Sequence, residues 1–131
     1  MTDGYRRVPE EWVEADVLAV VKRTARATSI DLGIPMPAVR WFKWGTYPGC
    51  EVAKPATDTG SNLRGFVRDI DPMTVYLACD LRIDEAAKYA AHEVRHAYQG
   101  QRPGRIAPRD EEADAQQYAD RWVRQQKGIA R

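Results

Sequence analysis

The sequence predicts an α+β fold in which an N-terminal helix precedes a small three-stranded β-sheet, and two further helices close the chain. Apolar residues recur at helical spacing near the amino terminus, which indicates the first helix. Aromatic and β-branched runs in the middle, bounded by glycine and proline, indicate the strands. Because 131 residues is the length of one domain, residues 1–131 are predicted to form a single domain.

The first helix is predicted to run from Pro9 to about Ile30. Pro9 suits a first helical turn, and the acidic residues that follow it lie near the positive end of the helix dipole. A glycine and two prolines in residues 31–37 end the helix. Its apolar residues repeat at helical spacing: Trp12, Val13, Val17, Val20 and Val21.

The sheet is predicted from three short segments. Residues 39–44 (VRWFKW) are dense in aromatic and β-branched side chains. Residues 45–62, rich in Gly, Pro, Thr and Asn, are expected to form a long loop. A β-hairpin follows, with strands near 63–68 and 73–79. Within its first strand, Gly65 indicates a bulge or a close approach of the backbone to another part of the chain.

The two C-terminal helices are predicted from the signals at their ends. The first runs from Asp84, a plausible N-cap, to about Gln99, with Gly100 as the C-cap. The second begins near Arg109 and is stopped at Gly128, with acidic side chains in its first turn and basic ones in its last. Several alanines along the first of these helices allow it to pack closely against a sheet.

Composition excludes several classes of protein. The 20 Lys and Arg nearly cancel the 19 Asp and Glu, so the charge gives no reason to expect a nucleic acid or an anionic membrane as partner. The first residues lack the apolar run of a signal peptide, and no apolar stretch approaches 18 residues. The two cysteines, Cys50 and Cys79, are too few for a disulfide framework. We therefore expect a soluble, cytoplasmic protein.

The chain has only two histidines, His92 and His96, and both lie in the sequence HEVRH. On a helix this spacing puts them one turn apart on one face, so both imidazoles can bind a single metal ion. Glu93 follows the first histidine and lies beside that face, where it can contact a metal-bound water without binding the ion. The alternative, without a metal site, is a polar helix with two exposed or hydrogen-bonded histidines.

A catalytic zinc site needs a third protein ligand, and no third histidine exists. The candidates are the acidic residues that open the last helix: Asp110, Glu111, Glu112 and Asp114. We expect the ligand to share the buried face of its helix with apolar residues. From Glu112 such a face continues along the helix, whereas from Asp110 the same register runs through polar residues. Glu112 is therefore the predicted ligand, and Glu111, which also aligns with apolar residues, remains an alternative.

An HExxH motif with a glutamate on a following helix resembles the gluzincin-type metallopeptidases. Residues 112–123 (EADAQQYADRWV) are similar to the third-ligand helix of the ImmA/IrrE family, which typically reads Glu-x-x-Ala-Asn-x-Phe-Ala before an apolar pair. Val94 and Arg95 stand where that family usually has Leu-Gly. The matching positions are Glu112, Ala115, Gln116, Tyr118, Ala119, Trp122 and Val123.

The resemblance implies a minimal zincin domain of the kind found in phage and bacterial genomes, acting as a zinc-dependent endopeptidase. In such a hydrolase His92, His96 and Glu112 bind Zn²⁺, and Glu93 is the general base that takes a proton from a metal-activated water. The expected partner is a protein or peptide substrate, whose main chain would pair with an exposed edge of the sheet.

Supporting residues around the site are harder to assign. The second ring nitrogen of a ligating histidine is usually held by a carboxylate or carbonyl, which Asp114 or Gln116 could supply. Tyr89, Tyr98 and Arg95 could donate a hydrogen bond to an oxyanion, but packing or solvated positions are the simpler interpretation of each.

Two rival functions remain open at this level. One is a catalytically inactive zincin-fold module that binds a protein and keeps a metal. The other is a DNA-associated protease, suggested by basic residues in the first helix and by four tryptophans, and disfavoured by the near-neutral net charge.

Overall fold

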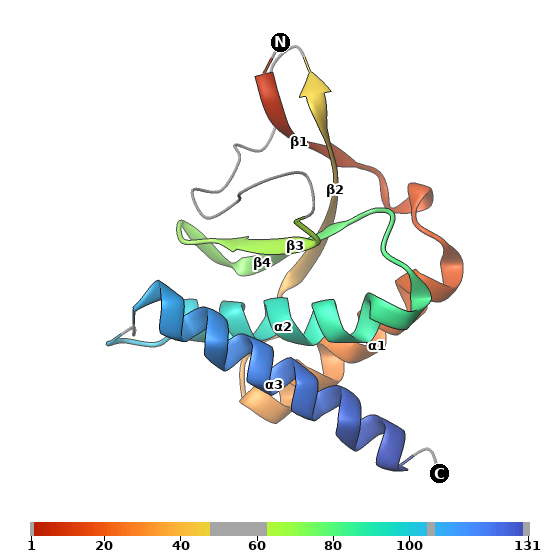
Figure 1. The fold of residues 1–131 in the computed structure, drawn as a ribbon. Coiled ribbons are helices and arrows are strands. Elements are labelled where there is room, and N and C mark those ends of the chain that lie inside the picture. Colours follow the sequence, from red (N-terminus) through yellow and green to blue (C-terminus); the bar gives the residue numbers. More distant parts are fainter. Residues whose placement is uncertain (1, 48–62, 105–106, 130–131) are drawn as a thin grey trace.

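A computed structural model describes residues 2–47, 63–104 and 107–129. Within these residues the fold is α+β, as predicted, with three α-helices and a four-stranded mixed sheet. The sheet lies on one side and the helices lie together on the other (Figure 1). The elements in chain order are β1 (Thr2–Val8), a short 3-10 helix (Glu10–Trp12), α1 (Ala15–Leu32), β2 (Ala38–Tyr47), β3 (Gly65–Arg68), β4 (Asp71–Ala78), α2 (Ile83–Gln101) and α3 (Pro108–Ile129).

The strand order in the sheet is β1-β2-β4-β3. The long strand β2 pairs with two other strands. Its residues 41–47 pair antiparallel with β1, and its residues 38–42 pair parallel with β4. Strand β3 pairs antiparallel with β4 and completes the predicted hairpin. In the described part of the chain, β1 and β3 are therefore the edges of the sheet.

The prediction of three strands is wrong because it omits β1. This strand carries Gly4 and two adjacent exposed arginines, so its sequence shows no regular alternation of apolar and polar residues. It is held instead by Tyr5, which is fully buried and meets the rings of Phe42 and Trp44 at centroid distances of 4.6 and 4.9 Å. Contacts with residues distant in sequence thus decide the conformation of this segment.

The first helix starts later than predicted, at Ala15 instead of Pro9. Residues Glu10–Trp12 form a separate 3-10 turn, after which the backbone is extended before α1 begins. The helix ends where the glycine and proline signals indicated. Gly33 follows it with a φ of 70°, a left-handed conformation that glycine adopts without steric cost.

The other two helices also differ from the prediction at their ends. The N-cap of α2 is Arg82, not Asp84, and the helix continues through Gly100 instead of ending there. A Cβ atom at Gly100 would lie 2.8 Å from Cβ of Pro72, so this glycine allows β4 to approach the helix closely. Similarly, α3 runs through Gly128 to its last described residue.

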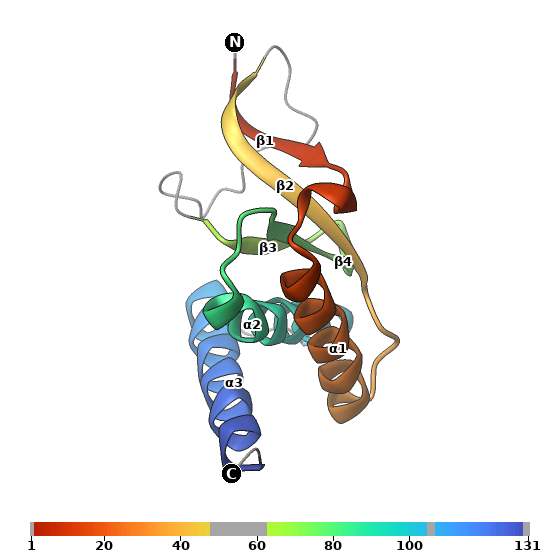
Figure 2. The same ribbon diagram turned by 90° about the vertical axis from the view of Figure 1, so that its right-hand side faces the viewer.

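Helix α2 lies at the centre of the helical layer, between α1 and α3 and beneath the sheet (Figure 2). Four of its alanines are almost fully buried, which lets the helix pack closely on its neighbours as expected: Ala86, Ala90, Ala91 and Ala97. None of the described helices is long and apolar enough to cross a membrane. Of the predicted loop, residues 45–47 belong to β2, and residues 48–62, with Cys50, lie outside the described residues.

Candidate metal centre

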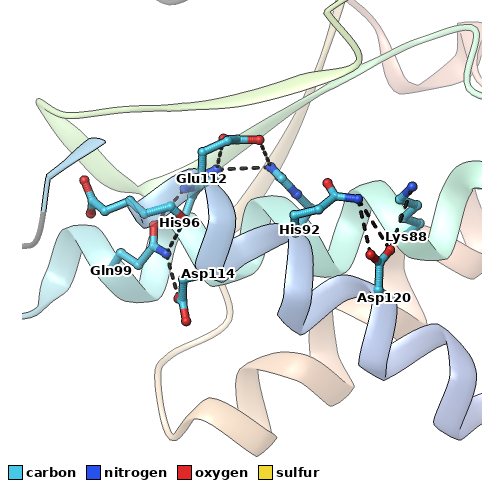
Figure 3. A network of polar contacts seen from close by, with 9 residues as sticks. Lys88, His92, His96, Gln99, Glu112, Asp114 and Asp120 are labelled. Atoms are coloured by element: carbon cyan, nitrogen blue, oxygen red, sulfur yellow. Dashed lines mark hydrogen bonds and ion pairs between the residues drawn. The ribbon is translucent and has the colours of Figure 1, made fainter. Parts of the chain in front are cut away.

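The two histidines occupy successive turns of α2 and direct their rings toward the first turns of α3 (Figure 3). Their Nε2 atoms are 3.1 Å apart, and the two rings are inclined by 74°. His92 is buried and His96 is partly buried. The i, i+4 spacing on one helical face therefore does bring both imidazole nitrogens to one point, as predicted.

Glu112 lies near the beginning of α3 and extends its carboxylate over both rings (Figure 3). Its Oε1 is 3.0 Å from Nε2 of His92, and its Oε2 is 2.9 Å from Nε2 of His96. The ligand atoms of the three residues all lie within 4.8 Å of one another. Of the four acidic candidates, Glu112 is thus the one that joins the two histidines.

The spacing of these atoms fits a small divalent cation. Ligand atoms placed 2.0–2.1 Å from a tetrahedral zinc ion are about 3.3–3.4 Å apart. The separations of 2.9–3.1 Å among the nitrogens and carboxylate oxygens are close to this value, so small side-chain movements would complete the geometry. Two imidazole nitrogens and a carboxylate could therefore hold a metal ion, and this mixed donor set suits several first-row metals.

The three groups are strongly coupled by charge. Burial by itself would lower the pKa of His96, but the hydrogen bond with Glu112, the charge of Glu93 and the hydrogen bond with Gln99 together raise this pKa to about 9. Hydrogen bonds from His92 and His96 hold the pKa of the Glu112 carboxyl well below its usual range. At neutral pH a cation that binds here must therefore displace a proton from His96.

Glu93 lies beside the cluster and is only 3% exposed. Burial raises its pKa, and the charges of His92 and His96 oppose this effect in part. Its Oε1 is buried and has no hydrogen-bond partner among the described residues. A carboxylate oxygen in this situation is a strong acceptor for any donor that reaches it, since an unpaired buried acceptor costs about 1–3 kcal/mol.

Gly65 is the residue of β3 that makes room for Glu93. A Cβ atom at this position would lie 2.8 Å from Cγ and 2.9 Å from Oε2 of Glu93. The φ angle of Gly65 is not positive, so glycine is required here for space and not for backbone conformation. The prediction of a close approach at Gly65 is confirmed, and the group approached is the carboxylate next to the candidate metal site.

The second nitrogen of His96 is held by Gln99, whereas Asp114 and Gln116 were the residues suggested for one of the two histidines. Nδ1 of His96 is 2.8 Å from Oε1 of Gln99. Gln116 contacts Asp120 instead, at 3.4–3.5 Å. The missed signal was the i, i+3 spacing of His96 and Gln99, which places the two side chains on neighbouring turns of one helix.

Glu112 does not lie on the buried face of α3, contrary to the prediction. The ligand was expected to share the buried face of α3, yet the side chain of Glu112 is 62% exposed and extends from the edge of that face. Glu111, the alternative, is buried, and its main-chain oxygen accepts a hydrogen bond from Gln99. The buried face of α3 comprises Glu111, Ala115, Tyr118 and Ala119.

The three possible oxyanion donors all have other contacts, in agreement with the simpler interpretation. Arg95 donates two hydrogen bonds to Asp114, at 2.7 and 3.0 Å. The hydroxyl of Tyr98 accepts a hydrogen bond from Arg102. Tyr89 packs against the main apolar core beneath the sheet.

No protein-family model matches this chain, and no curated protein or solved structure is significantly similar to it. The resemblance to gluzincins and to the ImmA/IrrE family therefore stays a prediction.

Proposed function

We propose that this chain is a zinc-dependent endopeptidase of the zincin type, similar to the ImmA/IrrE family. In this proposal His92, His96 and Glu112 hold Zn²⁺, and Glu93 is the general base. The observation that carries the proposal is the convergence of three ligand atoms, from two helices, within 4.8 Å of one another beside a buried carboxylate. A purely structural zinc site is usually closed by four protein ligands and has no use for such a carboxylate.

A zinc ion held by these residues would polarise the scissile carbonyl and lower the pKa of a water molecule to about 7. Glu93 accepts the proton of the attacking water and returns it to the leaving amine. The burial that raises the pKa of Glu93 suits this exchange, because a base whose pKa approaches the working pH both takes and releases a proton readily. The reaction needs no covalent bond between enzyme and substrate.

The edge strand β3 is the proposed place for the substrate backbone. It is the edge of the described sheet that lies against Glu93, through the contact of Gly65. An extended peptide added to this edge would pair through main-chain hydrogen bonds and run past the metal ligands. The partner is accordingly a protein or peptide and neither a membrane nor a nucleic acid, and the proposed location of the enzyme is the cytoplasm.

The deep burial of Glu93 favours a second candidate function, a catalytically inactive zincin-fold module that binds a protein and keeps the metal. With only 3% of Glu93 exposed, a substrate or water must enter a narrow space to reach it. In this module the same three residues would bind the metal, but Glu93 would not have to transfer protons.

Metal analysis combined with a proteolysis assay separates the two candidates. We expect about one zinc ion per chain in the purified wild type and in Glu93→Gln, and none in His96→Ala. Incubation with a mixture of denatured proteins, with new amino termini identified by mass spectrometry, should show cleavage by the wild type. Cleavage should fall at least 100-fold in Glu93→Gln, within the range of about 10²–10⁴ typical of general-base catalysis.

Each other outcome has a definite meaning. Zinc without cleavage of any substrate in the mixture would support the binding module over the enzyme. A wild type that binds no zinc or other divalent metal would contradict both candidates.

A further inference from the structure

Gln99 is almost fully buried, with 7% of its surface exposed, and makes three hydrogen bonds around the candidate metal centre. Its Oε1 is 2.8 Å from Nδ1 of His96. Its Nε2 donates to the main-chain oxygen of Glu111 and to Oδ2 of Asp114, each at 2.8 Å (Figure 3). One side chain thus connects a metal-binding histidine of α2 with two consecutive turns of α3.

These contacts leave one consistent arrangement of protons. The neighbours of the amide nitrogen of Gln99 are a carbonyl and a carboxylate, and neither of them has a proton to donate. The NH₂ group must therefore face α3, and the amide oxygen must face His96. An amide oxygen only accepts, so Nδ1 of His96 has to carry a proton. The lone pair of a neutral ring is then on Nε2, which is the atom that faces His92 and Glu112.

The Gln99 amide is prevented from turning over by the contacts of Asp114. The carboxylate of Asp114 receives two hydrogen bonds from Arg95, at 2.7 and 3.0 Å. The Arg95 guanidinium is itself fixed between two rings, with its central carbon 4.7 Å from the centroid of Tyr98 and 5.1 Å from that of Tyr118. Reversing the amide would place its oxygen against this carboxylate and against the Glu111 carbonyl, which is electrostatically unfavourable.

We infer that Gln99 is a positioning residue for the metal centre, with two effects. It holds His96 with the proton on Nδ1, so that Nε2 is available to the ion. Through the main-chain oxygen of Glu111, it also holds α3 at the distance at which the next residue, Glu112, reaches both histidines. The inference rests on the proposed metal site, and residues that hold ligating histidines in this way typically change metal affinity by 10- to 100-fold.

Gln116 provides a matched control for Gln99. It is a partly buried glutamine on α3, the other helix of the site, and its amide contacts Asp120 at 3.4–3.5 Å. The variants Gln99→Leu and Gln116→Leu both remove a side-chain amide. Only Gln99→Leu also removes a contact to His96.

The test measures zinc affinity by competition with a chromophoric chelator, after the metal has been removed from each protein. We expect Gln99→Leu to bind zinc about 10- to 100-fold more weakly than the wild type, and Gln116→Leu to stay within about twofold. Unfolding of the metal-free proteins, followed by circular dichroism, identifies any loss of affinity that merely reflects a less stable fold.

NMR of the imidazole nitrogens shows which nitrogen of His96 carries the proton. This would not change if Gln99 only stabilised the fold. Because the chain has only two histidines, their ¹⁵N signals are readily assigned with a His92→Ala variant. In the zinc-loaded wild type, His96 should show metal on Nε2 and a slowly exchanging proton on Nδ1. In Gln99→Leu, this proton should exchange faster.

The inference is overturned if Gln99→Leu folds, binds zinc as tightly as the wild type and keeps the slow Nδ1 proton. If Gln99→Leu does not fold, the wild type alone decides, since metal on Nδ1 of His96 would contradict the inference. A wild type that binds no zinc would instead contradict the proposed metal site.

Discussion

The two helices of the candidate metal centre hold their ligands in different ways. On α2, His92 is buried within a helix that packs on α1, α3 and the sheet. On α3, Glu112 is mostly exposed, and its helix packs mainly on α2. The backbone that carries the two histidines is therefore positioned by the core, whereas the glutamate depends on how one helix docks on another. That docking combines the apolar contacts of Ala115, Tyr118 and Ala119 with polar contacts near the beginning of α3. The polar contacts include those of Gln99 and the Arg95–Asp114 ion pair.

The two adjacent glutamates of α3 give the sharpest test of this contrast. Glu112→Ala should weaken zinc binding by more than about 100-fold, beyond the usual effect of residues that only support a ligand, because it removes a ligand itself. It should also lower the stability of the metal-free protein, but by at most about 1 kcal/mol, because the contacts with His92 and His96 are lost while the side chain is 62% exposed. Chelator competition and urea unfolding measure the two effects separately.

Glu111→Ala should show the reverse pattern. This side chain is buried, so its removal should lower the free energy of unfolding by about 1–3 kcal/mol. The stoichiometry of zinc should remain one per chain, because the main-chain oxygen that accepts from Gln99 is retained. Loss of zinc in Glu111→Ala together with its retention in Glu112→Ala would reverse the assignment of the third ligand.

A second test separates metal binding from proton transfer on α2. Gly65→Ala would place a methyl group 2.8 Å from Cγ of Glu93 and so displace its carboxylate. We expect peptide hydrolysis to fall at least tenfold, part of the factor of about 10²–10⁴ that a well-placed base supplies, while zinc affinity changes little. Rates of peptide cleavage and chelator competition on the same preparation would measure both.

Gly100→Ala is the control for crowding alone. Its methyl group would meet Pro72 at the same distance of 2.8 Å but would not touch Glu93. Equal losses of hydrolysis in the two glycine variants would show that crowding of the sheet against α2, and not displacement of the base, is responsible.

The smallest expected effect is a pH dependence of the stability of the fold, caused by Glu85 near the amino-terminal end of α2. Burial alone would raise the pKa of Glu85, but hydrogen bonds from the Arg82 backbone and from Arg64 outweigh it and lower this pKa. The carboxylate therefore stabilises the fold above its unfolded pKa of about 4.3, and this contribution is lost as the pH falls through the lowered folded value.

The matching measurement compares the wild type with Glu85→Gln in urea, with chelator present. The wild type should be more stable by at most about 1 kcal/mol at pH 7, and the difference should shrink below pH 4. Zinc affinity near neutral pH should be the same in both, because the histidines are held by the core and not by this contact. A clear drop in zinc affinity would show that the ligands of α2 also depend on polar anchors.

The fold was predictable where local pattern and tertiary packing agree. The first helix was predicted from apolar periodicity and the two C-terminal helices from the signals at their ends, although Asp84 and Gly100 misplaced the ends of α2. Strand β1 was missed because its adjacent exposed arginines hide any alternation, and the burial of Tyr5 among rings from other strands holds it in the sheet. Residues 48–62 lie outside the described structure, so the predicted loop is compared only at its start.

By itself, the sequence determined the part of the site that depends on a single helix. The spacing of His92, Glu93 and His96 fixes their relative directions, because the geometry of one turn is the same in every α-helix. Only the tertiary structure decided that Glu112 reaches them from an exposed edge, that Gln99 holds His96, and that Glu93 lies against Gly65. These contacts cross between elements, and their geometry depends on helix docking and strand order, which no local spacing specifies.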